Sequence, residues 1–120
     1  MSIQLGDTFY WKDGGHLWVV VSDPNLHGGE FVIVNLTKDV FLAGKECELN
    51  PGDHTWIIAK TYVYYGKARK VGLKEAANLL RQITLGTIKK HIPIDPNILN
   101  KIIAAGKTSK AISEDLKMYL

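Results

Sequence analysis

The chain has 120 residues, enough for one domain with its own hydrophobic core and too few for a second full domain. With 46% hydrophobic and 22% charged residues and no low-complexity segment, its composition excludes a disordered protein. Fifteen Lys and Arg against twelve Asp and Glu leave a net charge of +3. This mild basicity favours a polyanionic partner, although it also serves solubility.

The cysteine count and the N-terminal residues predict a cytoplasmic protein. The single cysteine, Cys47, has no partner for an internal disulfide. The first six residues lack the charged and apolar regions of a secretory signal. Every apolar run is only a few residues long, so we expect no contact with a membrane.

The first strands are predicted from short β-branched and aromatic runs separated by turn residues. Residues 7–11 (DTFYW) form the first run, and residues 12–15 (KDGG) form a tight turn. Residues 17–21 and 31–36 are two further runs, joined by a loop at 22–29 that contains Asp, Pro, Asn and two glycines. We predict that these two runs pair as a central hairpin.

Two or three more strands are expected before residue 72. Residues 45–49 alternate weakly and predict an edge strand. Residues 54–65 alternate over two surfaces and predict a long strand that bends near Lys60 and ends at Gly66. Residues 67–71 predict a short last strand.

The hydrophobic period then changes from two residues to a helical spacing. Residues 73–85 carry apolar side chains on one helical face. Asp95 and Pro96 are an N-cap and a first-turn proline for a second helix that ends at Gly106. A third helix is expected after Ser109, with Ile112 and Leu116 among its buried residues.

Strands followed by helices predict a mainly β fold with C-terminal helices. We expect a small antiparallel SH3-like barrel at residues 1–72, and about three α-helices at 73–120 that pack on the barrel as a C-terminal extension.

The common sequence motifs for nucleotide, zinc-protease and serine-hydrolase chemistry are absent from this sequence. The four histidines are scattered and show no ligand spacing with Cys47. The prediction is therefore that the protein uses no metal and no cofactor.

The polar end of the central hairpin is the first candidate for a chemical site. His16 begins one strand while Asn35 and Thr37 end the other, so in one register their side chains lie together. An imidazole there can take or give a proton near neutral pH. His54 is a further catalytic candidate. The alternatives are a solvated histidine for His16 and a turn hydrogen bond for His54.

A basic and aromatic surface is the second candidate site. Tyr62 and Tyr64 share one face of the long predicted strand, near Lys60 and Arg69, which suits stacking of bases and contact with phosphates. Half-buried barrel aromatics are the alternative reading. The candidate RNA-binding residues are Lys12, Asn35, Lys60, Tyr62, Tyr64 and Arg69.

Several short runs, taken in order, resemble a known family. They are Gly6-Asp7, Val19-Val20-Val21-Ser22, residues 32–37 (VIVNLT), Thr61-Tyr62-Val63 and Arg69. This order over residues 6–71 is similar to that of the bacterial PemK/MazF-like growth-inhibitor toxins. The family pattern runs Gly-Asp, then Arg-Pro-Val-Val-Val-Ser, then a strand ending Ile-Thr, then Ser-x-Val.

The resemblance implies an SH3-like barrel that forms a homodimer and cleaves single-stranded RNA without a metal. It also implies a toxin–antitoxin system in which a protein inhibitor, the antitoxin, binds the toxin. The family threonine falls on Thr37 and the family arginine on His16. A histidine must be protonated to stabilise a phosphorane as arginine does, or it acts instead as acid or base.

Three readings therefore stand after the sequence alone. The first is a metal-independent endoribonuclease in which His16 moves a proton while Thr37 and Lys60 or Arg69 hold the phosphoryl oxygens. The second is a non-catalytic SH3-like module that binds nucleic acid or protein. The third places the interaction in the helical tail.

Overall fold

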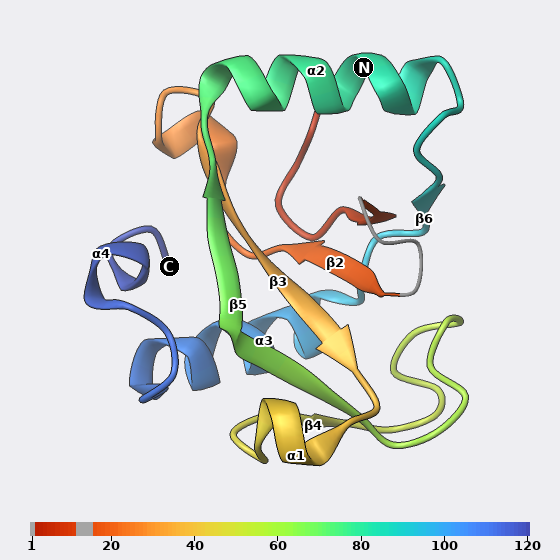
Figure 1. The fold of residues 1–120 in the computed structure, drawn as a ribbon, viewed down its shortest axis with the longest axis vertical. Coiled ribbons are helices and arrows are strands. Elements are labelled where there is room, and N and C mark those ends of the chain that lie inside the picture. The colour runs from red at the N-terminus through yellow and green to blue at the C-terminus, as the bar shows by residue number, and fades with distance from the viewer. Residues whose placement is uncertain (1, 12–15) are drawn as a thin grey trace.

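A six-stranded antiparallel sheet is the centre of the computed structural model, which describes residues 2–11 and 16–120 (Figure 1). Its strand order is β4-β5-β3-β2-β1-β6. The strands are β1 (Thr8–Tyr10), β2 (Leu17–Val20), β3 (Phe31–Thr37), β4 (Glu48–Leu49), β5 (Thr61–Val71) and β6 (Lys90–His91).

The predicted central hairpin is confirmed. Strands β2 and β3 pair with Leu17 opposite Leu36 and Val19 opposite Val34. The loop between them contains the short 3₁₀ helix η1 (Pro24–Leu26). Its N-cap residue, Asp23, accepts a hydrogen bond from the Asn25 N–H. β1 pairs with β2 on the other side, as predicted, while the turn predicted between them at 12–15 lies outside the described residues.

The predicted strand over residues 54–65 is confirmed from Thr61 onward, but it is wrong for residues 54–60 and for the predicted end at Gly66. Residues 50–60 form turns instead, because their hydrogen bonds are local: the Ile57 N–H donates to the His54 carbonyl. β5 then runs without a break through Gly66 to Val71. Its pairing with β3 changes register between Ile33 and Asn35, because β5 has more residues than β3 between the paired positions Arg69 and Tyr64.

The short elements η1, β6 and α1 (Val40–Ala43) were not predicted, and β4 was predicted too long. The edge strand expected at 45–49 is only the two residues of β4. β6, also two residues, pairs with β1 at the opposite edge of the sheet. The one-turn helix α1 follows β3, where Asp39 accepts hydrogen bonds from the Phe41 and Leu42 N–H groups. Elements this short leave no periodic pattern in a sequence.

The longer helices agree with the predicted ones. They are α2 (Leu73–Thr84) and α3 (Pro96–Thr108), which starts at the cap Asp95. The third predicted helix is the single turn α4 (Glu114–Lys117), and Ile112 is buried just before it begins. Within the described ranges, no helix combines the length and the apolar run that crossing a bilayer requires.

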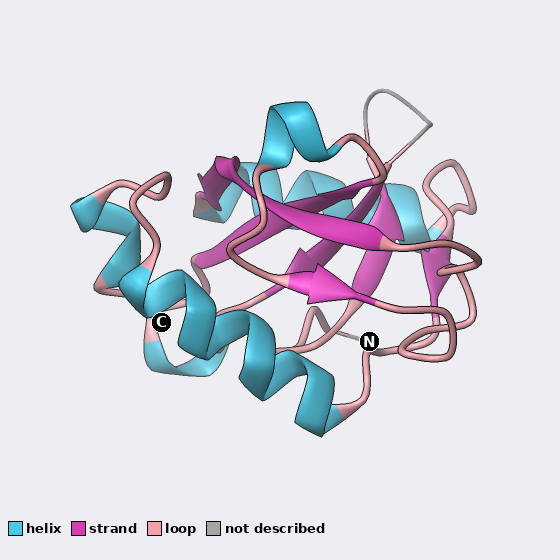
Figure 2. Ribbon diagram, turned by 90° about the horizontal axis from the view of Figure 1, so that it is seen from below, coloured by secondary structure: helices cyan, strands magenta, loops and turns pink. Residues whose placement is uncertain are grey.

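The two faces of the curled sheet are covered by different helices. Leu17, Val34 and Val63 belong to a cluster that also contains Leu99 and Ile102 of α3. Alternate residues such as Val20 and Ile33 point to the opposite face, where they cluster with Leu79 of α2. Figure 2 shows α3 on one side of the strands and α1 on the other.

Helix α3 lies close against β5. The hydroxyl of the buried Tyr65 donates to the Ile102 carbonyl at 2.6 Å, and burial raises the Tyr65 pKa. A Cβ atom on Gly106 would lie 3.2 Å from the Tyr65 ring. Glycine at this position thus permits the close approach of helix and strand.

The two edges of the sheet are drawn together through one carbonyl. Ile92, which follows β6, accepts from the Thr8 hydroxyl at 2.7 Å and from His54 Nε2 at 2.8 Å. His54 belongs to the segment after β4, so this bond links the ends of the strand order. The sheet is therefore a half-barrel, and the SH3 type of barrel stays a prediction.

Replacing Ile102 by alanine should cost about 2–5 kcal/mol in the free energy of unfolding, since a fully buried side chain leaves a cavity between α3 and the sheet. Urea denaturation measures the effect. Asn100→Ala, on the exposed side of the same helix, should stay within about 0.5 kcal/mol of the parent. Equal stability of both variants would show that α3 is not part of the core.

Candidate functional site

The sheet face that α2 covers is polar near α1. There the structure forms a cavity of about 660 Å³, which we call the sheet cavity. A second cavity of about 280 Å³, the side cavity, lies next to it, and both are lined by His16 and Thr37. The sheet cavity is lined by His16, Trp18, Asn35, Thr37, Leu42, Tyr64, Lys67 and Arg69. The side cavity is lined by His16, Thr37, Lys38, Asp39 and Trp56.

The register of the central strands explains this grouping. Trp18 is opposite Asn35 across the β2–β3 ladder, and Asn35 is opposite Tyr64 across β3–β5. Directly paired residues share a face of the sheet, and so do residues two apart, which adds His16 and Thr37. The polar end of the hairpin predicted from the sequence is thus one wall of a cavity.

His16 is held by one ring nitrogen. Its Nδ1 lies 3.2 Å from the Leu36 carbonyl, which accepts a hydrogen bond when Nδ1 carries a proton. In the neutral ring this leaves the lone pair on Nε2, and in the imidazolium it leaves a second N–H there. Because His16 lines both cavities, this nitrogen is suited to exchange a proton with a bound molecule.

Thr37 ends β3 with its hydroxyl in a defined orientation. Its Oγ1 accepts the Asp39 N–H at 3.1 Å, which leaves the hydroxyl proton free to be donated. Asp39 in turn caps α1. The start of α1 therefore fixes the position of the Thr37 oxygen.

Two polar side chains of the sheet cavity have no hydrogen-bond partner among the described residues, and one of them, Trp18, has its N–H closed off from solvent. Asn35 is 4% exposed, and no partner for its carboxamide occurs among the described residues. Trp18 is 8% exposed, and its indole N–H is buried without a partner in the same part of the chain. Buried polar groups are usually hydrogen-bonded, so the Trp18 N–H requires an explanation, whereas the Asn35 amide is open to the cavity that it lines.

The sheet cavity is lined by two cations of different character. Lys67 is exposed on β5. Arg69 is engaged: its Nη2 lies 2.7 Å from both carboxylate oxygens of Glu75, and its guanidinium stacks 4.9 Å from the centre of the Trp11 ring. Glu75 offsets much of the Arg69 charge, which leaves Lys67 as the more available cation.

The structure places three other predicted site residues outside both cavity linings. His54 is buried, with Nδ1 accepting the Trp56 N–H at 3.0 Å and Nε2 donating to Ile92, so both nitrogens have structural partners. Lys60 pairs with Glu48 at 3.8 Å. Tyr62 is buried opposite Thr37 on the neighbouring strand. A fourth predicted residue, Lys12, lies outside the described residues.

Three residues that line the sheet cavity, and three that line the side cavity (Lys38, Asp39 and Trp56), were missed from the sequence. Trp18 and Lys67 stand two positions from His16 and Arg69, so the strand period of two was a usable signal for them. Leu42 had no such signal, because it reaches the sheet cavity from the unpredicted helix α1.

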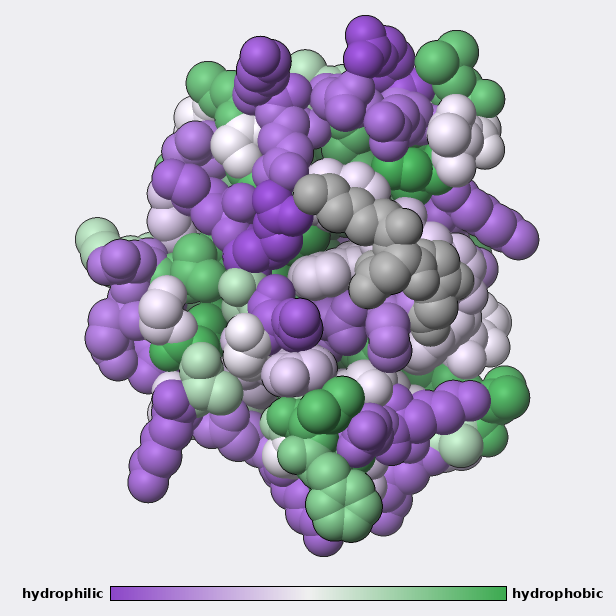
Figure 3. Space-filling model, in the orientation of Figure 1, coloured by the Kyte–Doolittle hydropathy of each residue, from purple (hydrophilic) through white to green (hydrophobic). Residues whose placement is uncertain are grey.

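An apolar projection adjoins the sheet cavity. Phe41 is 96% exposed, and its neighbour Leu42 is also exposed. Figure 3 shows this projection as a green protrusion at the place that α1 occupies in Figure 1. Large exposed apolar side chains beside a cavity are typical of a binding surface.

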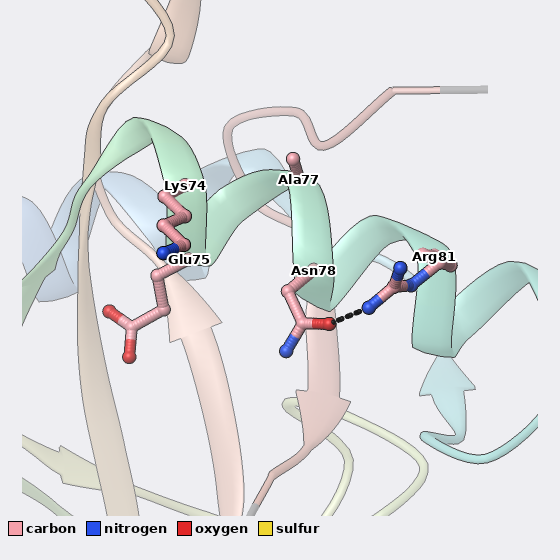
Figure 4. Close-up of a pocket in the computed structure, with 5 residues that line it drawn as sticks. All are labelled: Lys74, Glu75, Ala77, Asn78 and Arg81. Carbon is pink, nitrogen blue, oxygen red and sulfur yellow. Dashed lines mark hydrogen bonds between the residues drawn. The ribbon is translucent and has the colours of Figure 1, made fainter.

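A third cavity, of about 690 Å³, lies along the outer surface of α2. Its described lining comes from this one helix, and the Arg81 guanidinium donates to the Asn78 side chain at 2.6 Å (Figure 4). The lining residues are Lys74, Glu75, Ala77, Asn78 and Arg81. No histidine, serine or cysteine is among them, and the Glu75 carboxylate is paired with Arg69, so this cavity is a weaker candidate for proton transfer than the two that His16 lines.

Metal-binding side chains are not grouped in the described ranges, where no three His, Cys, Asp or Glu residues lie together as ligands. Cys47 is buried in the core beneath α3, and burial raises the pKa of its thiol. The thiol form therefore dominates, and Cys47 acts as a core side chain.

Comparisons with family models, with curated proteins and with solved structures each find no match. The resemblance to growth-inhibitor toxins consequently depends on the short runs in the sequence alone and stays a prediction.

His91, on the edge strand β6, is the histidine with a shifted pKa. Burial lowers its pKa from the ordinary value of 6.5, and the charges of Lys89 and His54 lower it further. Its Nε2 is buried without a partner in the described part of the chain, and its ring packs against Tyr10 at 4.6 Å.

The stability of the protein should fall as the pH drops below 6.5, because the unfolded chain then binds a proton at His91 that the folded protein resists. His91→Phe keeps the packing against Tyr10 and should flatten this part of the pH profile. Urea midpoints at several pH values between 5 and 8 test it. A profile identical in variant and parent would exclude His91 as the cause.

Proposed function

We propose that the protein is an endoribonuclease that cleaves single-stranded RNA, and that His16 and Thr37 are its catalytic residues. The observation that carries this proposal is that these two residues line both neighbouring cavities. Cleavage inside a strand requires room for a nucleotide on each side of the reacting phosphate. Two cavities that share a proton-transfer group and a hydroxyl donor provide such an arrangement.

The chemistry follows from the groups at the shared wall. His16 Nε2 takes the proton of a ribose 2′-OH while the 2′ oxygen forms a bond to phosphorus. The bond from phosphorus to the 5′ oxygen then breaks, and this oxygen takes a proton from the imidazolium or from solvent. The products are a 2′,3′-cyclic phosphate and a free 5′-OH.

Charge that develops on the phosphoryl oxygens needs donors close by. The Thr37 hydroxyl has a free proton, and Lys67 supplies a positive charge on the sheet cavity. No carboxylate is among the described residues that line the sheet cavity, which favours an anionic ligand there. The net charge of +3 likewise favours an anionic ligand.

The toxin resemblance extends this proposal to the biological setting. In it the half-barrel is a divergent SH3-like barrel, the active form is a homodimer, and a protein inhibitor controls the nuclease in the cytoplasm. The exposed Phe41 and Leu42 beside the sheet cavity offer such a protein an apolar contact.

A non-catalytic RNA- or protein-binding module is the second candidate function. It is favoured by Arg69, because pairing with Glu75 removes the fixed positive charge that phosphoryl transfer commonly uses. A binding module has no need of such a charge at a reacting phosphate.

His16→Ala should slow cleavage of single-stranded RNA by about 10²–10⁴-fold, which is the usual contribution of general acid–base catalysis. The parent reaction should continue in excess EDTA, leave a 2′,3′-cyclic phosphate and stop when hydrogen replaces the 2′-OH. Gel analysis of labelled strands measures all three. His27→Ala, outside both cavity linings, is the matched control.

Binding of RNA by the parent without any cutting, or unchanged cutting by His16→Ala, would replace the nuclease proposal by the binding module.

Thr37→Val should reduce the cleavage rate by about 10²–10³-fold, as loss of one transition-state donor does elsewhere, whereas Thr37→Ser should keep most of it. Valine matches the shape of threonine but has no hydroxyl for the phosphoryl oxygen or for the Asp39 N–H. Cleavage rates are compared at saturating RNA after thermal melting has shown both variants folded. Equal rates for the two variants would remove Thr37 from the mechanism.

A further inference from the structure

We propose that Asn35 and Trp18 form a nucleobase subsite in the sheet cavity and that Asn35 reads the edge of one unstacked base. This inference depends on the proposed function in taking single-stranded RNA as the ligand. It adds a residue that selects which nucleotide is bound.

The carboxamide of Asn35 and the buried, unpartnered indole N–H of Trp18 are the starting point. Asn35 stands on a strand paired on both sides, in a position where β-branched residues are ordinarily favoured. Its side chain is 4% exposed, lines the sheet cavity and has no hydrogen-bond partner among the described residues. Water in the cavity can satisfy this amide, so a ligand that displaces the water must replace its hydrogen bonds.

The chemistry of the amide suits a base edge. A carboxamide offers a donor and an acceptor side by side, and bases present the same pair of groups. Trp18, directly opposite Asn35, adds an indole N–H that likewise has no partner in the described structure. A phosphate has only acceptors, so it would leave the acceptor half of the amide unsatisfied.

Aromatic surface is available on the other side of the amide. Tyr64 pairs with Asn35 across β3–β5, is half-buried and lines the same cavity. Stacking on a tyrosine ring holds a base without regard to its identity, while hydrogen bonds to the base edge select it. Tyr64 thus supplies affinity and Asn35 supplies selection.

The position of Asn35 relative to the reacting groups completes the argument. Asn35 and Thr37 are two residues apart on one face of β3, which separates them by about 6.5 Å along the strand. The base read by Asn35 therefore belongs to a nucleotide next to the phosphate at His16 and Thr37.

The test measures binding separately from cleavage. Four short strands carry one central base, A, C, G or U, between abasic nucleotides, so only the central base can be read. Hydrogen in place of every 2′-OH prevents cutting. Fluorescence anisotropy should show the best and worst strands differing by about 5- to 150-fold in affinity for the parent protein.

Asn35→Ala should bring the four affinities to within about twofold of one another, and Asn35→Ser should do the same if the alanine variant fails to fold. Asn100→Ala, an exposed asparagine on α3, should keep the parent ratios. Equal affinities in the parent, or parent ratios in a folded Asn35 variant, would overturn the subsite and leave the nuclease proposal standing. Failure of the parent to bind any of these strands or ordinary single-stranded RNA would overturn both.

Discussion

The pairing of β3 on both sides is the constraint on which the rest of the structure depends. Its neighbours β2 and β5 fix the register of every residue, so alternate side chains are committed to opposite faces. One set, including Val34 and Leu36, enters the core beneath α3. The other set begins with Phe31 and Ile33 under α2 and ends with Asn35 and Thr37 in the sheet cavity.

Along one face of β3, core residues are therefore followed by residues of the candidate site. The change follows the reach of α2, whose Leu79 packs in the cluster with Phe31 and Ile33. Beyond that cluster the face is left to α1 and to polar side chains.

The sequence was sufficient for features that depend on long or paired patterns. The hairpin of β2 and β3, the helices after Asp95 and after Gly72, and the proximity of His16 to Thr37 all follow from periodicity and turn residues. His54 and the segment around it show the limit of such patterns. Alternation predicted a strand there, but local turn bonds and the distant Ile92 carbonyl determine its conformation. Contacts between segments far apart in the chain leave no periodic trace, and for the same reason the pairing of Arg69 with Glu75 was not foreseen.

The position of β6 has a consequence for synthesis on the ribosome. Thr8 of β1 bonds to Ile92, 84 residues further along the chain, and the Ile94 N–H bonds to the Gly6 carbonyl. During translation β1 therefore stays an open edge after β2 and β3 have formed. At about 5–20 residues per second this interval lasts several seconds, long enough for another nascent strand to pair with it. A factor that covers newly made edges would protect this chain during that interval.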